Sequence, residues 1–524
     1  MIDLCNSKTR KEEINEFFKW LLNKDDVELQ SEVDLSLVTD YYDANIYYPT
    51  EIARFFNTKA MKRLERVSQL GLVLLENENC YHNRLEHSKG TYNRKVEELI
   101  FRYKDESFRK YIEDNDMKVY LLAELIKEAG HDIGHLPLSH IIELKIMNHK
   151  GFHEIIGKRI LNEDPEIQEV LKSIDSRLPE VLEESLNNDI LNFKAHDESS
   201  YDIDRLDYLN RDALYYGYRQ TYLPHEEYKS VFVELNSDGS IKKSPDGSLI
   251  LANSNCAHKK RIDVYDSKSL SEIEKALQSR SEAYSNVYYS SNTQLEDSTV
   301  GLFLQELLNR SPNQAVELQD FISKLKSTPA DQIDLAEYIT WDDFRFYKNC
   351  IDVAQNNEDS NFRSFATMVI PPAKSLMNFT YSSFNLRNKE QIRYSEEELQ
   401  ILKLIKSIVD GDDELSTNLK TPKYFFKNCR FTSDKTKIEK LKSKLGERVN
   451  CSEATIRSYN VNEPIFIKDE HGNIFSLDEH PNRSVNWGDE KKVVSIAFIL
   501  LPQLQRTTKE ILDGTDYYDF DGNR

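Results

Sequence analysis

The sequence predicts a mainly α-helical protein with a β-hairpin insertion and a smaller mixed α/β lobe towards the C-terminal end. Three observations predict this class. Apolar residues recur every three or four positions from about residue 12 to residue 220, which is the spacing of amphipathic helices. Short β-prone stretches separated by Gly-containing turns interrupt that pattern at about 228–266. Alternation typical of strands returns after residue 421.

Each region can be justified in chain order. Residues 1–50 are expected to form an N-terminal helical extension, because 13–22 have helical periodicity and a linker-like segment follows. Residues 51–330 are expected to form the core, with β-prone runs at 231–233 and 248–251 inside the excursion. Residues 331–420 are interpreted as a helical continuation, with a periodic stretch at 395–410. Residues 421–524 are expected to form the α/β lobe, with strands at 464–468 and 493–499.

Composition limits the classes of partner. Hydrophobic residues make up 39% of the 524, so a substantial core can be buried and general disorder is excluded. The 69 basic and 90 acidic side chains give a net charge of -21, which argues against duplex DNA or an anionic membrane as a partner. No apolar run approaches the ~18 to 20 residues of a membrane span. The N-terminus also lacks a signal-peptide stretch, and a cytoplasmic protein is expected.

Histidine is unevenly distributed along the chain. The sequence has 12 histidines. Imidazole is the commonest nitrogen ligand of transition metals and the usual proton carrier near neutral pH, so crowding favours a metal or acid-base centre. Seven of the 12 fall within 72 residues, and these are His82, His87, His131, His135, His140, His149 and His153.

The densest motif follows an apolar helical stretch at 121–130. That stretch runs directly into His131 and Asp132, which together can offer one nitrogen and one carboxylate oxygen to a single ion. Two more histidines follow, four and nine residues after the first. Gly134 and Pro137 lie between them and allow the backbone to turn towards the same place.

Two other segments can complete a coordination shell. Upstream, Arg84 precedes His87 by three residues and therefore lies on the same face of a helix. Downstream, a helical wheel of 201–212 places Asp204 on a polar face opposite an apolar one, although a solvated amphipathic helix would look the same. The polar face holds Asp204, Tyr208, Arg211 and Asp212.

The candidate ligands form a mixed nitrogen and oxygen set without thiolates. Such a set suits Mn, Fe, Mg or Zn, and a closed structural metal site is the alternative reading. The extra histidines and arginines nearby favour a substrate on which negative charge develops. The four candidate metal ligands are His87, His131, Asp132 and Asp204.

This ordered series resembles the H...HD...D signature of the HD metal-dependent phosphohydrolases. The surrounding residues resemble one branch, the deoxynucleoside triphosphate triphosphohydrolases (dNTPases and dGTPases), and in particular the catalytic core of the mammalian member with SAM and HD domains. The resemblance runs from about residue 62 to residue 289. It implies the same four metal ligands and, as catalytic residues, His140, Glu143, His153, His135 and Arg84.

The same resemblance implies how each residue acts. His140 and Glu143 match a proton-carrying dyad, and Arg84 matches an arginine that holds phosphate oxygens. Tyr208 matches an aromatic residue that packs under the sugar and excludes a 2′-hydroxyl. The substrate-binding residues implied are Gln69, Leu70, Arg205, Tyr208, Asp212, Arg280 and Tyr288.

Gln69 and Asp212 match contacts to the 3′-hydroxyl. Arg205 stands where the family has a lysine, which keeps the charge but changes its geometry. Where the mammalian member binds an activating nucleotide, this chain has Asn57, Lys62 and Glu65, a poor match. Another nucleotide effector site remains open.

The activity implied is cleavage of a dNTP to deoxynucleoside and inorganic triphosphate. The cofactor implied is a divalent ion, with Mn, Mg or Fe ahead of Zn or Co. A homo-oligomer, whether dimer, tetramer or hexamer, is expected by resemblance. Two alternatives stay open: an HD-family nucleotidase or phosphodiesterase acting on another nucleotide, and a non-catalytic oligomer that senses nucleotides.

Overall fold

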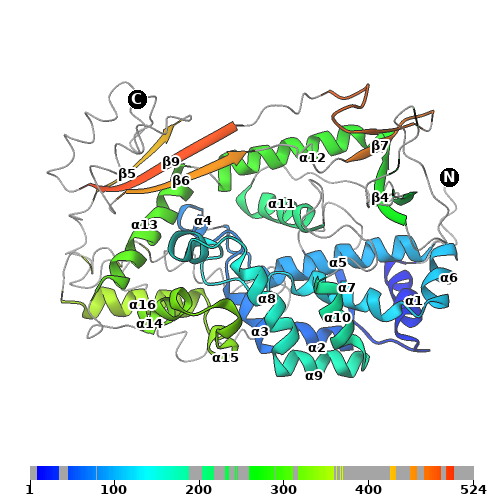
Figure 1. Ribbon diagram of the computed structural model, residues 1–524, viewed down its shortest axis with the longest axis horizontal. Helices are drawn as coiled ribbons and strands as arrows, with labels where there is room; N and C mark the ends of the chain where they lie inside the picture. Colours follow the sequence, from blue (N-terminus) through cyan, green and yellow to red (C-terminus); the bar gives the residue numbers. More distant parts are fainter. Residues whose placement is uncertain are drawn as a thin grey trace.

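A computed structural model confirms the mainly helical class with small sheets (Figure 1). No helix in the described part of the chain is long and apolar enough to cross a membrane. The structure describes 9–34, 45–77, 79–104, 106–187, 203–217, 230–234, 236, 242, 245, 259–288, 291–310, 317–358, 362, 366, 369, 425–431, 449–456, 465–471, 473–484 and 491–500.

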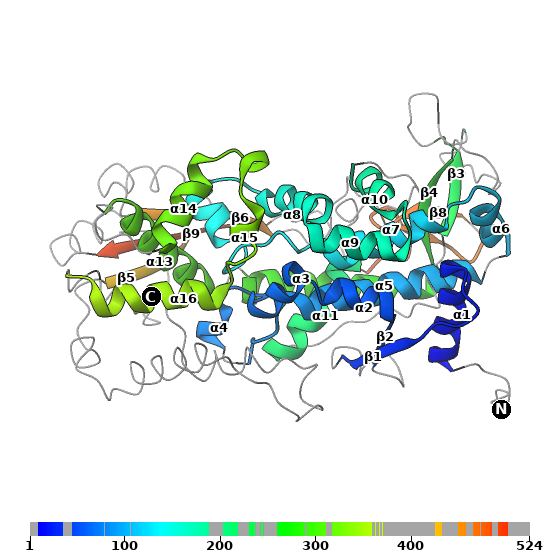
Figure 2. The same cartoon turned by 90° about the horizontal axis from the view of Figure 1, so that it is seen from below.

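The N-terminal region contains a helix and a small sheet. Helix α1 (Arg10–Leu22) begins at a capping box between Thr9 and Glu12 and buries one apolar face. The following segment, interpreted from the sequence as a linker, contains strand β1 (Leu29–Val33), which pairs antiparallel with β2 (Asn45–Pro49). Both strands lie beside α1 in Figure 2. These strands form because residues 29–33 pair with residues 45–49, and helical periodicity does not reveal such pairing.

Helix α5 (Arg84–Tyr103) runs through the middle of the helical core and is buried along almost its whole length (Figure 1). It contacts α1, α7 (Lys118–Gly130) and α11 (Ile203–Tyr216). The remaining helices of this region are α2 (Thr50–Phe56), α3 (Lys59–Arg63), η2 (Leu64–Arg66), α4 (Val73–Glu76), α6 (Glu106–Asp114), η3 (Glu143–Met147), α8 (Phe152–Glu163), α9 (Pro165–Ile174) and α10 (Leu178–Asn187).

The expected β excursion is confirmed as β3 (Ser230–Glu234) and β4 (Lys259–Asp266), which pair antiparallel. The expected 464–468 strand is β7 (Phe466–Lys468), which pairs parallel with β4 and antiparallel with β8 (Ile474–Ser476). The sheet order is β3-β4-β7-β8, so the insertion and the C-terminal region share one sheet. Helix α12 (Leu270–Ala283) packs on it through a common apolar cluster. The run at 248–251 lies outside the described residues.

A second C-terminal sheet lies beside α13 (Ser291–Leu308) in Figure 1. Its order is β5-β9-β6, and the expected strand at 493–499 is the central one. The strands are β5 (Phe425–Phe431), β6 (Val449–Ile456) and β9 (Lys491–Leu500). The periodic stretch at 395–410 lies outside the described residues.

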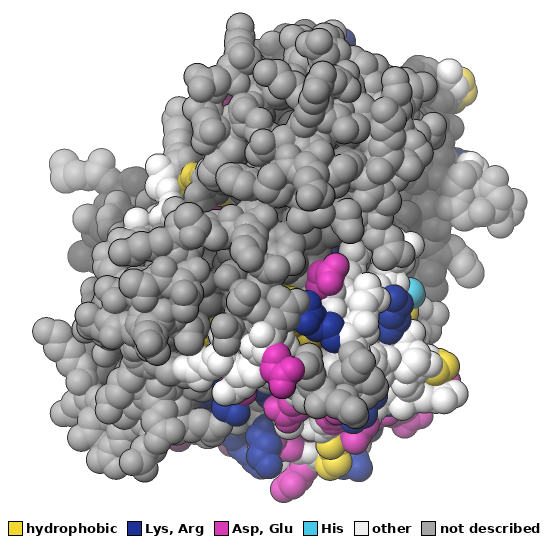
Figure 3. Space-filling model, turned by 90° about the vertical axis from the view of Figure 1, so that its left-hand side faces the viewer, with side chains coloured by type: hydrophobic (Ala, Val, Ile, Leu, Met, Phe, Trp, Pro, Cys, Tyr) yellow, Lys and Arg dark blue, Asp and Glu magenta, His cyan; other side chains and the backbone are white. Residues whose placement is uncertain are grey.

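Short helix η5 (Ser267–Ser269) directly precedes α12, and η6 (Tyr284–Tyr288) directly follows it. After α13 come α14 (Glu317–Ser327) and η8 (Ala330–Gln332). They are followed by α15 (Leu335–Tyr338) and α16 (Asp343–Asn356), which share the main buried apolar cluster with α1, α5 and α7. On the face drawn in Figure 3, the described side chains carry charges of both signs close together.

Candidate metal centre

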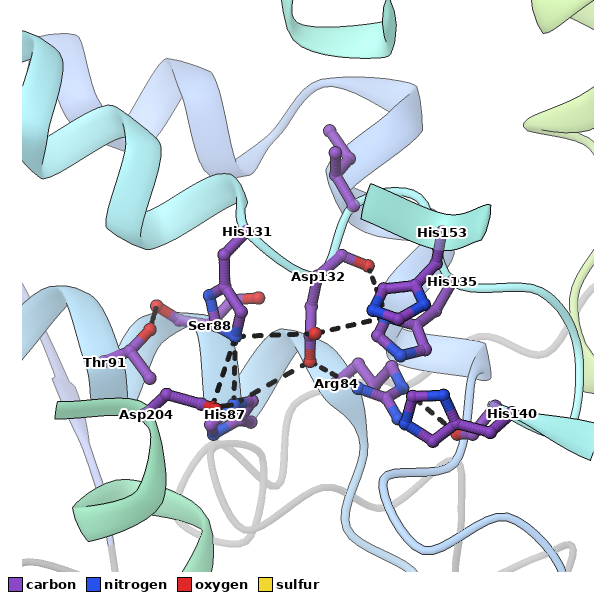
Figure 4. Close-up of polar contacts among 12 residues, drawn as sticks. Arg84, His87, Ser88, Thr91, His131, Asp132, His135, His140, His153 and Asp204 are labelled. Atoms are coloured by element: carbon purple, nitrogen blue, oxygen red, sulfur yellow. Dashed lines mark hydrogen bonds and ion pairs between the residues drawn. The ribbon is translucent and has the colours of Figure 1, made fainter. Parts of the chain in front are cut away.

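Three helices bring the predicted metal ligands to one place (Figure 4). His87 lies in the first turn of α5, His131 follows the end of α7, and Asp204 lies in the first turn of α11. The Nε2 atom of His87 lies 2.8 Å from Oδ1 of Asp204 and 3.2 Å from Nε2 of His131. The ligand atoms of these three residues all lie within 4.8 Å of one another, a spacing that one ion could bridge.

The fourth predicted ligand lies at the edge of this group. Asp132 places Oδ1 3.4 Å from Nε2 of His131 and Oδ2 3.7 Å from Nε2 of His87. Its carboxylate also accepts a 2.5 Å hydrogen bond from Nη1 of Arg84. Asp132 can therefore bind a cation and the Arg84 guanidinium at the same time.

Each imidazole has a partner that fixes its orientation. Nδ1 of His131 lies 2.8 Å from the carbonyl oxygen of Glu128, and Nδ1 of His87 lies 2.8 Å from Oδ2 of Asp207. A carbonyl or carboxylate in this position holds the proton on Nδ1 and leaves the Nε2 lone pair for a metal. The sequence named His87 and His131 but missed Asp207.

The electrostatics of the group favour positive charge. Burial disfavours a charged His87, but hydrogen bonds to Asp204 and Asp207 outweigh it and raise its pKa to about 10. Burial also opposes ionisation of Asp132, yet Arg84 and the imidazoles of His135 and His131 hold its pKa well below the usual range. A site that favours a proton through two carboxylates also favours a divalent cation, so the donor set fits the predicted metal.

A second group of histidines gathers around Glu143. Its Oε1 lies 2.8 Å from Nδ1 of His140, and its Oε2 lies 2.9 Å from Nδ1 of His153. Burial opposes ionisation of Glu143, but these two hydrogen bonds dominate and lower its pKa. The ring of His135 lies 3.9 Å from that of His153, centroid to centroid. This triplet of histidines also has a spacing that could hold an ion.

Gly134 makes this gathering sterically feasible. A Cβ at Gly134 would lie 2.0 Å from the carbonyl oxygen of His153 and 2.4 Å from the amide nitrogen of Gly157. Any side chain there would push the loop away from α8. Gly134, predicted from the sequence to let the backbone turn, therefore also lets its loop approach α8 closely.

The loop that carries His135 and His140 is held by side chains from distant elements. Arg63, at the end of α3, donates to the carbonyl oxygens of Ile133 at 2.6 Å and His135 at 2.8 Å. Tyr338 of α15 donates to the carbonyl oxygen of Gly134 at 2.6 Å. These buried hydrogen bonds fix a loop that has few backbone partners of its own.

Asp343, the first residue of α16, connects this loop to the strand-like segment before Gln69. Its carboxylate accepts from the amide of Leu138 at 2.7 Å and from that of Ser68 at 2.9 Å. Leu138 and Ser139 both have φ of 58°, in the left-handed region that such residues rarely adopt. Burial raises the pKa of Asp343 to about 7 against the opposing effect of its backbone hydrogen bonds. No local pattern in the sequence predicts this role of Asp343.

Tyr208, Tyr284 and Tyr288 form a group of rings, and Tyr208 lies next to the predicted metal ligand His87. The Tyr208 ring lies 6.4 Å from the His87 ring and 6.2 Å from that of Tyr288, centroid to centroid. Tyr284 and Tyr288 meet edge to face at 5.0 Å, and the Arg280 guanidinium lies 5.5 Å from the Tyr284 centroid. The structure therefore brings Tyr208, Tyr288 and Arg280 together, although they come from α11, η6 and α12.

Asp212 is buried between two partners. Its Oδ1 lies 2.7 Å from Nε2 of His82, and its Oδ2 accepts a 2.5 Å hydrogen bond from the Tyr288 hydroxyl. His82 stacks on Tyr215 at 4.4 Å. His82 belongs to the histidine cluster of the sequence. No local pattern predicts its contact with Asp212.

The other predicted nucleoside contacts lie close by. Gln69 donates its backbone amide to the carbonyl oxygen of His82 at 3.2 Å. Its side-chain Oε1 is buried and has no hydrogen-bond partner among the described residues. Leu70 and Tyr288 both pack against a small buried cluster that contains Val73 and Val287. Arg205 lies on α11 directly after Asp204 and is half-buried.

The helical wheel of α11 describes only part of its environment. Asp204 and Tyr208 face the site as predicted, but Arg211 is completely buried. It binds Asp207, one turn earlier, with 2.9 Å between Nε and Oδ2. Helix α11 is thus enclosed on more than one side, which excludes the reading as a solvated amphipathic helix.

Comparisons with known proteins show what the chain is similar to. No protein-family model matches it. It is 33% identical over 164 residues to YwfO of Bacillus subtilis, an uncharacterized protein, covering 30% of this chain and 35% of that one. It is 24% identical over 332 residues to a putative HD domain-containing protein of Acanthamoeba polyphaga mimivirus, covering 58% and 70%. The match to YwfO thus spans only about a third of that relative.

Two further similarities bear on the class. The chain is 27% identical over 203 residues to the deoxynucleoside triphosphate triphosphohydrolase SAMHD1 homolog of Dictyostelium discoideum, covering 37% of this chain and 38% of that protein. A solved phosphohydrolase from Bacteroides thetaiotaomicron aligns with a TM-score of 0.57 over 90% of this chain and 100% of its own. At 16% identity, that likeness shows the fold alone.

The similarity to HD-domain proteins, together with the site, supports a relationship to the HD-domain phosphohydrolases, and the fold is shared with a solved phosphohydrolase. The two groups of histidines and carboxylates are consistent with the divalent metal dependence of that class. The substrate is a separate question, because HD enzymes share the metal ligands and differ in the pocket beside them.

Proposed function

We propose that this protein hydrolyses a deoxynucleoside triphosphate to the deoxynucleoside and inorganic triphosphate. The observation that carries the proposal is that His87 lies next to both Asp204 of the candidate metal group, at 2.8 Å, and the ring of Tyr208, at 6.4 Å between centroids. A substrate bridging the two would present its α-phosphate to the ion and its sugar to the tyrosines. The similarity to the Dictyostelium discoideum protein, whose name states this activity, supports the same substrate class.

The ion would be held by the four predicted ligands, with Mn, Mg or Fe ahead of Zn or Co. When bound, such an ion supplies a Lewis acid for a phosphoryl oxygen and lowers the pKa of a water molecule. Asp207 and the carbonyl oxygen of Glu128 keep the two imidazoles in the required tautomer. The ligands proposed for it are His87, His131, Asp132 and Asp204, whose side chains lie close together in Figure 4.

Arg84 and two histidines are proposed to contact the phosphates. Arg84 is buried, and its Nε also donates to the Ser139 hydroxyl at 3.1 Å. This places the guanidinium in a fixed direction, where it offsets charge that grows in the transition state. The rings of His135 and His153 lie 3.9 Å apart, centroid to centroid, and are proposed to contact the phosphates as well. Arg205 and Arg280 are proposed to bind the outer phosphates.

His140 is proposed to carry the proton of the reaction. Its side chain is 49% exposed while that of Glu143 is 2% exposed. Because Glu143 holds Nδ1, the other ring nitrogen is available to protonate the departing 5′-oxygen or to accept a proton from water. The buried carboxylate stabilises the imidazolium that either step requires.

The nucleoside is proposed to lie among the tyrosines. Tyr208 would pack under the sugar and leave no space for a 2′-hydroxyl. A 3′-hydroxyl can satisfy the unpartnered Oε1 of Gln69, since buried polar atoms normally have a partner. The same hydroxyl could replace Tyr288 on Asp212, while His82 keeps that carboxylate in place. Leu70 would contact the sugar or base.

The assembly and regulation are proposed by the same resemblance. We expect a homo-oligomer in the cytoplasm, and a nucleotide effector at a site other than the poorly matching residues before Gln69. Light scattering with and without nucleotide tests both expectations.

The test of the activity is product analysis. The protein is incubated with each dNTP and each matching NTP in the presence of Mn²⁺, Mg²⁺ or Co²⁺, and the products are separated by ion-exchange chromatography. The proposal predicts one triphosphate per deoxynucleoside released, with dNTPs preferred. Orthophosphate or monophosphate products would indicate the nucleotidase or phosphodiesterase alternative. The absence of turnover with bound metal would indicate the sensing alternative.

A further inference from the structure

We infer that Asp34, outside every motif noted in the sequence, is a positioning residue for the metal centre. It acts on His87 through Arg211 and Asp207. The inference rests on the proposed metal centre and adds to it a residue from the N-terminal region. Asp34 directly follows strand β1.

The first step of this chain of contacts lies next to the ion site. Nδ1 of His87 lies 2.8 Å from Oδ2 of Asp207. The orientation of His87 therefore depends on where the Asp207 carboxylate lies. Arg211 holds that carboxylate with two hydrogen bonds, 2.9 Å from Nε to Oδ2 and 3.1 Å from Nη2 to Oδ1. This bidentate arrangement restricts the carboxylate in both position and rotation.

The second step connects Arg211 to Asp34. Nη1 and Nη2 of Arg211 lie 3.2 Å and 2.8 Å from the two carboxylate oxygens of Asp34. Asp34, Arg211 and Asp207 each have side chains that are 0% exposed. A guanidinium buried this deeply requires opposite charge nearby, because desolvation is costly.

The net charge of the buried ion pairs behind His87 determines how they affect the affinity for a metal ion. Arg94 contributes a second buried guanidinium, with Nε 3.6 Å from Oδ1 of Asp207. The two carboxylates and two guanidiniums of Asp34, Asp207, Arg94 and Arg211 sum to zero. Neutralising Asp34 would leave one net positive charge behind His87, which would repel a divalent cation in front of it.

The helix that carries His87 is shaped to receive this network. Gly90 lies three residues after His87 on α5. A Cβ at Gly90 would lie 2.1 Å from Oδ1 of Asp207 and 2.2 Å from Nη2 of Arg211. Glycine inside a helix is less stabilising than alanine, and here it makes room for the ion pair between Asp207 and Arg211. This packing is independent of the hydrogen bonds and points to the same arrangement.

The test measures Mn²⁺ affinity by isothermal titration calorimetry, with no substrate present. Loss of an outer-shell partner of a metal ligand typically weakens binding by about 10- to 100-fold. We expect Asp207→Asn to fall in that range and Asp34→Asn to weaken Mn²⁺ binding by about 10-fold. Thermal unfolding confirms that each variant is folded.

The matched control is Glu98→Gln. Glu98 lies on α5, about three turns after His87, and is buried between Lys95 and Arg102 in a comparable ion-pair group. Its loss should lower the unfolding temperature and leave Mn²⁺ affinity within about twofold of the wild type, because it lies outside the metal's supporting shell. An equal loss of affinity in Glu98→Gln and Asp34→Asn would overturn the specific role of Asp34.

A second measurement uses the unmodified protein and does not depend on a variant folding. If His87 and Asp34 are coupled, saturating Mn²⁺ should slow amide hydrogen exchange in β1 by about 10-fold or more, with α9 unchanged. Wild-type protein that binds no Mn²⁺ overturns the proposed metal centre itself. Protein that binds Mn²⁺ without protection of β1, or Asp34→Asn with wild-type affinity, overturns the role of Asp34 alone.

Discussion

The proposed metal side and the proposed nucleoside side of the site, called the metal side and the nucleoside side below, are built differently. On the metal side, each imidazole ligand has a second partner on its other ring nitrogen, Asp207 for His87 and the Glu128 carbonyl oxygen for His131. On the nucleoside side, Tyr208, Tyr284 and Tyr288 mostly meet through their ring edges. Hydrogen bonds fix direction, whereas ring contacts fix shape.

This difference implies that the residues of one side control the reaction and those of the other control which substrate is accepted. Changes on the metal side should remove activity towards every substrate, because all substrates share the reacting phosphate. Changes on the nucleoside side should alter which substrate is accepted and at what concentration. The predictions below test that separation, beginning with the largest effect.

Asp204→Asn should break the metal side completely. Removing a ligand charge should release the ion, and kcat should fall by about 10³-fold or more with every nucleotide, since the ion supplies several kcal/mol of transition-state stabilisation. Metal content by mass spectrometry and steady-state kinetics check this. Asp116→Asn is the matched control, because Asp116 is 77% exposed and pairs with Arg177 on the surface. Full activity in Asp204→Asn would contradict the metal assignment.

Glu143→Gln should separate proton transfer from metal binding. An amide cannot stabilise the imidazolium of His140, so kcat should fall by about 10²- to 10⁴-fold while metal content and KM stay close to wild type. The pH dependence of kcat should change as well, because the titration of His140 no longer benefits from a carboxylate. Loss of the metal together with activity would show that the Glu143 group binds an ion instead.

Tyr208→Ala should act on the nucleoside side alone. Opening space beside the sugar should raise KM for dNTPs and reduce the preference for dNTPs over NTPs by about 10-fold, the size of a modest steric discrimination. Metal content should not change. Kinetics with paired dNTP and NTP substrates measure the ratio. An unchanged ratio would remove Tyr208 from sugar selection.

Asp343 spans the two sides and should give the smallest effect, on stability. Its folded pKa of about 7 is above the unfolded value, so the native state holds the proton more tightly. Its contribution is therefore greatest at low pH and is lost as the pH rises through about 7. Between pH 6 and pH 8 the wild type should lose about 1 kcal/mol more than Asp343→Asn, measured by urea unfolding. Equal changes in both proteins would contradict the shifted pKa.

Much of the fold could be predicted from the sequence, and the candidate ligands could be named from it, for a physical reason. Helical periodicity and strand alternation are local properties, and the HD motif marks a helix end at which His131 and Asp132 emerge. His87 and Asp204 could be named because each opens a helix within a recognisable motif. Their convergence was an inference from resemblance, and the structure places Nε2 of His87 2.8 Å from Asp204.

The supporting residues could not be predicted because their contacts are long-range. Asp343 binds an amide 205 residues away and Asp34 binds a guanidinium 177 residues away, and no local pattern marks either pair. The left-handed φ of Leu138 also runs against residue preference and is imposed by the surroundings. Asp207 was closer to prediction, since it lies one turn before Arg211 on the same helix.

The position of the ion tests the central claim most directly. Crystals grown with Mn²⁺ can be measured at a wavelength at which manganese scatters anomalously. The account predicts a peak about 2.0 to 2.3 Å from Nε2 of His87, Nε2 of His131 and Oδ1 of Asp204. A peak among His135, His140 and His153 with none at His87 would contradict the account.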